Sequence, residues 1–224
     1  MNISEALETG RTTFMGIELL VAPGVLVPRP ETELLGKTAV QMLRAIDLHA
    51  PRVIDMCCGA GNLGCAIAHH VPLSSVWCCD LTDQSVSVAR RNVAFLHFAH
   101  RVSVHQGDLF GALMGYGLEG TIDMIVCNPP YISDKRLSDE RASLLELEPR
   151  EAFAAGPYGV SIHARVVKDA FDFLRPGGIM LFEVGLGQDR QVITLFQRTK
   201  AYDDVSVIHD EAREGRVVFG RRTR

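Results

Sequence analysis

The chain has 224 residues, 47% of them hydrophobic, which is enough to form one domain with a complete core. Its formal net charge of -4 at pH 7 argues against nucleic acid as a partner, because nucleic-acid-binding domains are usually basic. The first eleven residues are polar and predict no signal peptide, and no apolar run reaches the roughly 20 residues that a membrane span needs. We therefore expect a cytoplasmic protein with no membrane partner.

The six cysteines show no metal-binding pattern. They form two adjacent pairs and two single residues without C-x-x-C spacing, so we expect free thiols that pack as small hydrophobic side chains. The sequence therefore predicts no metal site. The cysteines are Cys57, Cys58, Cys65, Cys78, Cys79 and Cys127.

Short apolar segments near the N-terminus predict a β-hairpin or arm. Thr12–Val21 and Val25–Val27 surround a glycine and a Pro-Gly pair, which favour turns. We expect residues 1–30 to form this arm and to pack on a catalytic domain of residues 31–224.

Helices and strands alternate in the rest of the chain. The apolar residues of Glu31–His49 recur with the 3.6-residue period of a helix. The elements predicted after it are strand Arg52–Met56, helix Leu63–His70, strand Ser75–Cys79, helix Asp83–His97, strand Val102–Gln106, a helical turn Leu109–Met114, strand Ile122–Cys127, helix Ile162–Leu174, strand Ile179–Val184, helix Gln188–Lys200, and strands Val205–His209 and Arg216–Gly220.

This alternation predicts an α/β fold with a mostly parallel sheet and helices on both faces, because helical crossovers join parallel strands. The last two strands predict an antiparallel hairpin at one edge. A seven-stranded sheet with this ending resembles the Rossmann-like fold of class I S-adenosylmethionine-dependent methyltransferases. Five arginines at the C-terminus are expected on a solvated edge strand and a frayed tail. They are Arg213, Arg216, Arg221, Arg222 and Arg224.

Asn128-Pro129-Pro130-Tyr131 directly follows a predicted strand, and open α/β sheets bind ligands at the carboxyl ends of their strands. The two prolines make a rigid turn without backbone donors. The Asn128 amide can donate and accept hydrogen bonds, and the Tyr131 ring can stack on a flat group. This combination suits a planar –NH2 group on a carbonyl or an aromatic ring. We therefore predict that these four residues form the catalytic site of a methyltransferase acting on amide or amino nitrogen.

Three earlier strand ends carry residues suited to a nucleoside cofactor. Gly59 and Gly61 permit a sharp turn and a close approach of a ligand just before a helix. Asp80 ends the next strand and can accept both hydroxyls of a ribose, and Asp108 ends the third and can accept from an adenine amino group. NAD is the rival cofactor, but the loop lacks the G-x-G-x-x-G spacing and the Asn-Pro-Pro-Tyr turn has no role in hydride transfer.

The segment Val27-Pro28-Arg29-Pro30-Glu31-Thr32-Glu33 matches the P-R-P-E-T-E signature of the bacterial protein-glutamine N5-methyltransferases, the HemK/PrmC family. The chain resembles this family from about Thr13 to Gly220. Further matching segments are the Asp80 strand end, Asn128–Ile132, Leu147–Ala152, and Phe182–Gly185 with Gln188.

The resemblance implies methylation of a glutamine side-chain amide in class-I peptide-release factors, at their Gly-Gly-Gln loop. S-adenosylmethionine would be the cofactor and S-adenosylhomocysteine the product. By position, Asn128–Tyr131 would hold the glutamine, and Ser133–Tyr158 would cover it. The residues expected at the cofactor are Arg29, Glu31, Thr32, Asp55, Cys57, Cys58, Gly59, Ala60, Gly61, Asn62, Asp80, Leu81, Asp108, Leu109 and Asn128.

The chain departs from the family pattern in two places. Family members usually have glycine where Cys57 stands, and we expect the loop to be an unstrained variant because Gly59 and Gly61 remain. Family members also typically carry a helical domain ahead of the hairpin, where this chain has about a dozen residues. The resemblance therefore covers the catalytic domain.

The expected mechanism is geometric, because an amide nitrogen is a poor nucleophile. The side-chain oxygen of Asn128 and the carbonyl of Pro129 would each accept one N–H, so that the nitrogen lone pair faces the sulfonium methyl. Positioning of this kind can contribute ~7–11 kcal/mol. Methylation makes the nitrogen acidic, so we expect no histidine or lysine base.

Three other functions stay open at this point. The same chemistry could act on another amide or amine, in a protein or a small molecule. A nucleic-acid methyltransferase could use the same turn on adenine N6 or guanine N2, but it would need a basic groove. A cofactor-binding subunit without catalysis is the third. The sequence does not determine the oligomeric state.

Overall fold

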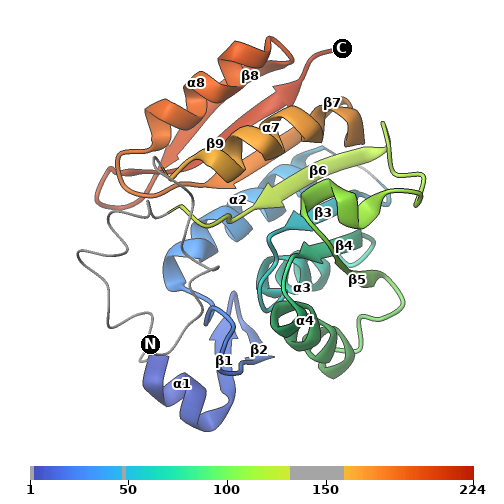
Figure 1. Ribbon diagram of the computed structural model, residues 1–224, viewed down its shortest axis with the longest axis vertical. Coiled ribbons are helices and arrows are strands. Elements are labelled where there is room, and N and C mark those ends of the chain that lie inside the picture. The colour runs from blue at the N-terminus through green and yellow to red at the C-terminus, as the bar shows by residue number, and fades with distance from the viewer. Residues whose placement is uncertain (1–2, 47–48, 132–158) are drawn as a thin grey trace.

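The computed structural model describes residues 3–46, 49–131 and 159–224. Its centre is a seven-stranded sheet of order β5-β4-β3-β6-β7-β9-β8, drawn in Figure 1. The first five strands in this order are parallel, and β9 is antiparallel to both of its neighbours. The predicted sheet is therefore confirmed. The strands are β3 (Arg52–Met56), β4 (Ser75–Asp80), β5 (Val102–Gln106), β6 (Ile122–Cys127), β7 (Leu174–Glu183), β8 (Tyr202–His209) and β9 (Gly215–Arg222).

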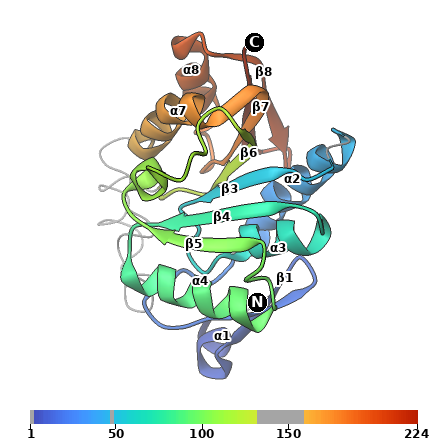
Figure 2. The same cartoon turned by 90° about the vertical axis from the view of Figure 1, so that its right-hand side faces the viewer.

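Helices cover both faces of the sheet. α2, α3 and α4 share one hydrophobic cluster with the strands, and α7, α8 and the 3-10 helix η2 share another. Figure 2 shows α7 and α8 on the opposite side of the sheet from α2 and α3. The helices are η1 (Pro30–Thr32), α2 (Glu33–Ala45), α3 (Asn62–His70), α4 (Asp83–Phe95), η2 (Leu109–Leu113), α7 (Ser161–Phe173) and α8 (Asp189–Thr199).

Strand β6 is buried along its whole length, as expected for a central strand that is covered on both faces. Its only charged residue, Asp123, accepts a hydrogen bond from the Arg52 backbone N–H at 2.8 Å and forms an ion pair with Arg175. These partners offset part of the cost of burying the carboxylate. β6 is therefore stable between two layers of helices and can support the turn that follows it.

The predicted N-terminal hairpin is present as β1 (Arg11–Phe14) and β2 (Ile17–Leu20). A short helix that the sequence did not predict, α1 (Ile3–Thr9), precedes it. Only Ala6 of this helix is buried, against Val21 and Val27. A seven-residue helix is too short to show a clear apolar period, so packing rather than pattern explains it.

Strand β7 begins at Leu174, five residues before the predicted start at Ile179. Ile122 pairs with Leu174, and two residues later Met124 pairs with Ile179, so the Arg-Pro-Gly-Gly segment bulges out of the sheet. Strand β8 also begins early, at Tyr202, and a similar irregularity follows Asp203. The sequence prediction placed both strand starts too late, because each start contains turn-forming residues. A β-bulge accommodates such residues, whereas a regular strand pairing does not.

Three of the five C-terminal arginines, Arg216, Arg221 and Arg222, lie on β9, which is not an edge strand, so the prediction was wrong for these three. β9 lies between β7 and β8, because the second strand of the hairpin, not the first, pairs with β7. Arg216 is buried, Arg221 donates to the Gly177 carbonyl at 2.9 Å, and Arg222 lies over the Phe171 ring at 4.1 Å. These three arginines therefore make contacts within the fold.

Among the described residues, no helix is long and apolar enough to cross a membrane. All six cysteines are free thiols, and five of them are buried, as expected for small core side chains.

Buried His163 generates a test of stability against pH. It lies on α7, with its Nε2 3.2 Å from the Glu183 carbonyl oxygen and its ring beside Phe182. Burial lowers the pKa of His163 from 6.5 to about 4, although the hydrogen bond to Glu183 acts in the opposite direction. The unfolded chain therefore binds this proton first, and acid destabilises the native state.

We predict that His163→Gln removes this penalty. As the pH falls from 6.5 towards 4, the wild type should lose about 1.4 kcal/mol of unfolding free energy per pH unit relative to the variant. Denaturant unfolding of both proteins at several pH values measures the difference, and His209→Gln at an exposed position is the control. A constant difference between wild type and His163→Gln across this range would contradict the prediction.

Candidate functional site

The pairing of three parallel strands brings the predicted site together. Met56 of β3 pairs with Cys79 of β4 and with Cys127 of β6. The residues that follow, Cys57, Asp80 and Asn128, therefore leave the sheet at one level of its carboxyl edge. This is the edge where open α/β sheets bind ligands.

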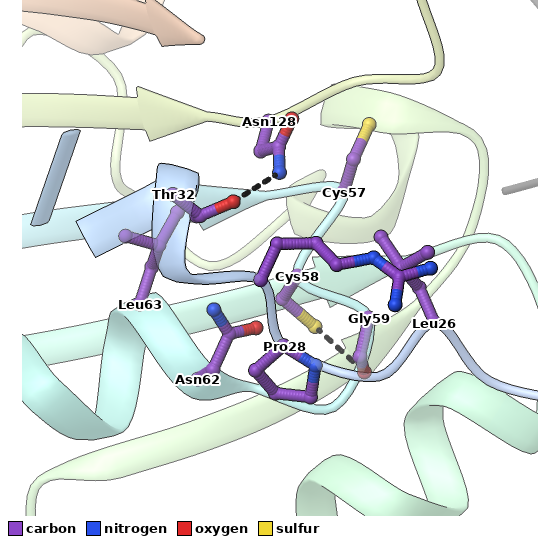
Figure 3. A pocket seen from close by; sticks show the side chains of 10 residues that line it. Leu26, Pro28, Thr32, Cys57, Cys58, Gly59, Asn62, Leu63 and Asn128 are labelled. Carbon is purple, nitrogen blue, oxygen red and sulfur yellow. Dashed lines mark hydrogen bonds between the residues drawn. The ribbon is translucent and has the colours of Figure 1, made fainter. Parts of the chain in front are cut away.

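A hollow lies at this edge, with about 340 Å³ of empty space including the part open to solvent. Figure 3 shows its lining, which comes from the segment before η1, the loop after β3, the start of α3 and the end of β6. Seven lining residues were predicted at the cofactor, and Leu26, Pro28 and Leu63 were not. The seven are Arg29, Thr32, Cys57, Cys58, Gly59, Asn62 and Asn128.

The other predicted cofactor residues do not line the hollow. Asp80 lies half-buried at the end of β4, and Leu81 beside it is 59% exposed. Glu31 is exposed, and Asp108 pairs with Arg165 of α7 at 2.7 Å. Those not lining the hollow are Glu31, Asp55, Ala60, Gly61, Asp80, Leu81, Asp108 and Leu109.

The Asp80 carboxylate holds the glycine loop. Its Oδ2 accepts the Gly59 backbone N–H at 2.9 Å, and its Oδ1 accepts the Thr82 backbone N–H at 3.1 Å. An ionised carboxylate offers about four acceptor positions, so both oxygens keep capacity for a ligand. Gly59 has no atom within 4 Å of the place where a Cβ would stand, so the loop backbone is open to close approach.

Asp55 does not line the hollow and instead supports the glycine loop from inside the core. It is fully buried, and its Oδ2 accepts the Gly64 backbone N–H at 2.8 Å. Burial raises the pKa of Asp55 to about 7, with the Asp80 charge adding to the rise and the Gly64 hydrogen bond opposing it. Asp55 therefore connects β3 to the first turn of α3.

Cys57 has a φ of 59°, so the expectation of an unstrained loop was wrong. A left-handed backbone is costly for a residue with a Cβ, whereas glycine adopts it freely. Gly59 and Gly61 also have positive φ, 54° and 77°, but they do not remove the need for a positive φ at position 57, where family members usually have glycine. The turn after β3 requires a left-handed residue at position 57 whichever side chain stands there.

The Asn128 amide is held from one side. Its Nδ2 donates to the Thr32 hydroxyl at 3.2 Å, and Figure 3 shows the amide oxygen at the end away from Thr32. Thr32 is 2% exposed, so this contact is shielded from water. A segment 96 residues away in the sequence therefore sets the direction of the predicted catalytic side chain.

The turn after β6 is held at its far end by Gln188. The side-chain Nε2 of Gln188 donates to the Tyr131 carbonyl at 2.8 Å, and its Oε1 accepts the Gly185 N–H at 3.0 Å. A Cβ on Gly185 would lie 2.9 Å from the Tyr131 ring and 2.7 Å from Gln188. Tyr131 is therefore packed against the connection between β7 and α8, and Pro129 and Pro130 lie between it and Asn128 in the sequence.

Asn92 is a supporting residue that the sequence interpretation missed. It is fully buried on α4, accepts the Leu20 N–H at 2.7 Å, and donates to the carbonyls of Leu20 and Ala60 at 2.9 Å. It therefore ties the N-terminal hairpin to the glycine loop. The available signal was a polar residue between the apolar Ala89 and Val93 on the buried face of a helix.

The matched segments Ile132 and Leu147–Ala152, and the segment Ser133–Tyr158 expected over the substrate, lie outside the described residues.

Known proteins are similar to this chain. The Methyltransferase small domain family matches residues 33–146. A release factor glutamine methyltransferase of Streptomyces coelicolor is 34% identical, over 88% of this chain and 68% of that protein. A 4-amino-L-phenylalanine/4-methylamino-L-phenylalanine methyltransferase of Streptomyces pristinaespiralis is 35% identical, over 88% and 66%. The crystal structure of a release factor-specific protein-(glutamine-N5) methyltransferase from Alicyclobacillus acidocaldarius is 26% identical, with a TM-score of 0.52 over 91% of this chain and 99% of that one.

We predict that Cys57→Gly stabilises the protein by about 1 kcal/mol relative to Cys57→Ala, because glycine relieves the left-handed backbone and alanine does not. Both variants remove the sulfur, so their difference isolates the backbone. Thermal unfolding of the two variants measures it. Equal stability would show that the loop relaxes without strain.

Proposed function

This chain belongs to the release factor glutamine methyltransferase family, and we propose that it methylates the side-chain amide nitrogen of a glutamine in a peptide-release factor. It is an enzyme that uses S-adenosylmethionine. The observation that carries the proposal is the Asn128 amide, held by Thr32 at the rim of a hollow formed by the glycine loop. We place the target glutamine in the Gly-Gly-Gln loop of a class-I release factor.

The residues around the hollow fit this cofactor. The open space at Gly59 admits a ligand against the loop backbone, and Asp80 keeps acceptor capacity for two ribose hydroxyls. Asp108 can accept from an adenine amino group, since its surface pair with Arg165 is weak and more than half of the Asp108 side chain is exposed. We assign Leu81 and Leu109 to the same end, and Arg29, Glu31 and Thr32 to the methionine end.

S-adenosylmethionine supplies an electrophilic methyl group on a sulfonium sulfur. The protein's part is to direct the amide nitrogen towards it. We infer that the Asn128 Oδ1 and the Pro129 carbonyl each accept one N–H of the substrate –NH2. With both N–H bonds fixed, the nitrogen lone pair points in one direction, towards the methyl group. The entropy cost of aligning the amide with the methyl group is then met on binding rather than in the chemical step.

The residues that line the hollow are also consistent with loss of the amide proton without a side-chain base. Ten residues in the described part of the chain line the hollow, and none of them is histidine or lysine. Methylation makes the amide nitrogen strongly acidic, so its proton can pass to water without a side-chain base. Tyr131, packed beside Gly185, would limit the substrate amide to one plane.

A second candidate is methyl transfer to an aromatic amine. The relative from Streptomyces pristinaespiralis is named for 4-amino-L-phenylalanine, and it matches this chain as well as the glutamine methyltransferases do. The same Asn128 geometry would accept from an aniline –NH2. A nucleic-acid substrate has less support, because Arg216, Arg221 and Arg222 make contacts within the sheet.

A release factor acts in the cytoplasm, and a cytoplasmic location also suits the six free thiols. We therefore propose this location for the enzyme.

Transfer of labelled methyl to a purified class-I release factor tests the proposed function. We expect label on the factor, and loss of label when the glutamine of its Gly-Gly-Gln loop is changed to alanine. 4-Amino-L-phenylalanine is assayed in parallel. Label on the amino acid and none on the factor would assign the second function and reject the first.

We predict that Asn128→Ala lowers turnover at least ~100-fold, because it removes an acceptor that directs the substrate amide. Cofactor affinity, measured by calorimetry, should remain largely intact. Asn62→Ala is the matched control: it truncates another lining asparagine and should weaken cofactor binding more than turnover. Near-normal turnover in Asn128→Ala would contradict the proposed positioning of the substrate amide by Asn128.

A further inference from the structure

Glu183 is a buried carboxylate that the mechanism described so far does not use. It ends β7 and is 2% exposed. Its Oε2 has no hydrogen-bond partner among the described residues, and Arg216 Nη2 lies 3.6 Å from its Oε1. Burial of a carboxylate costs stability unless both oxygens are paired, and one oxygen of Glu183 is not, so packing alone does not account for this residue.

The Thr32 hydroxyl connects this carboxylate to the catalytic turn. Its oxygen accepts from Asn128 Nδ2 at 3.2 Å, so its single hydrogen must go to another acceptor. Burial raises the pKa of the Glu183 carboxyl, and the Thr32 and Tyr131 hydroxyls, which lie close to it, oppose this rise. An ionised carboxylate can only accept, so the Thr32 hydrogen points to Glu183.

This chain of hydrogen bonds has one direction. Because the Thr32 hydrogen is committed to Glu183, its oxygen can only accept from Asn128. The nitrogen end of the Asn128 amide is then turned inward, and its oxygen end is left for the substrate. The reverse orientation would set the –NH2 of Asn128 against the –NH2 of the substrate, donor against donor.

We propose that Glu183 is a positioning residue, which acts through Thr32 to hold the Asn128 amide with its oxygen towards the substrate nitrogen. The proposal rests on the proposed function of Asn128 as the acceptor for a substrate –NH2. It assigns to the end of β7 a role in the orientation of the catalytic side chain.

The proposal has a consequence for pH. Burial raises the pKa of Glu183, and the nearby Glu31 charge adds to the rise, whereas the Thr32 and Tyr131 hydroxyls and Arg216 oppose it. His163 faces the Glu183 backbone carbonyl, and burial keeps it neutral down to a pKa of about 4. Once protonated, Glu183 can donate to Thr32, and the hydroxyl is free to turn. Turnover should therefore fall as the pH drops through the raised pKa of Glu183.

Glu183→Gln is the direct test, because glutamine keeps the shape and can donate. We expect the kcat for methyl transfer to the release factor to fall roughly 10- to 100-fold, with cofactor affinity retained. The acid-side loss of kcat that we expect for the wild type should disappear in the variant. Asp123→Asn is the matched control, since it neutralises another buried carboxylate that pairs with an arginine, at the start of β6 away from the site.

Thr32→Val gives a second, independent test of the proposal if Glu183→Gln does not fold. It removes the hydroxyl at nearly constant shape, and the double variant should be no slower than the slower single variant, since both break one chain. A wild-type kcat with no loss on the acid side, or a Glu183→Gln variant with normal kcat and an unchanged acid side, would overturn the proposal. Absence of methyl transfer by the wild type would instead reject the proposed function.

Discussion

The site depends on one constraint, the register of three parallel strands. Because Met56 is level with both Cys79 and Cys127, the chain leaves β3, β4 and β6 at the same height. Asp80 can then hold the Gly59 N–H while Asn128 stands across the same edge. A shift of one residue in any of these strands would turn its side chains to the other face and separate these groups.

Buried polar side chains transmit this register to parts of the chain that are distant in sequence. Asn92 joins the hairpin to the glycine loop, Asp55 joins β3 to α3, and Gln188 joins α8 to the turn at Tyr131. Each makes hydrogen bonds that only one arrangement of backbones can satisfy. A hydrophobic core of the same volume would tolerate small sliding between elements, whereas these contacts do not.

The N-terminal segment is part of the site, although the family match begins only at residue 33. Leu26, Pro28 and Arg29 line the hollow, and Thr32 contacts Asn128. The Met15 N–H donates to the Glu33 carboxylate at 3.0 Å, which joins the hairpin to the start of α2. The Asn128–Tyr131 turn is therefore held at one end by Thr32 of η1 and at the other by Gln188.

The sequence by itself determined the alternation of strands and helices, the carboxyl edge as the site, and most of the loop residues around the hollow. These follow from local periodicity and from residue types at strand ends, which need no knowledge of distant contacts. Tertiary structure alone decided that β9 enters between β7 and β8, that Cys57 takes a left-handed φ, and that Leu26 and Leu63 line the hollow. It also decided the orientation of Asn128, because an amide can point either way until Thr32, 96 residues earlier in the chain, lies beside it.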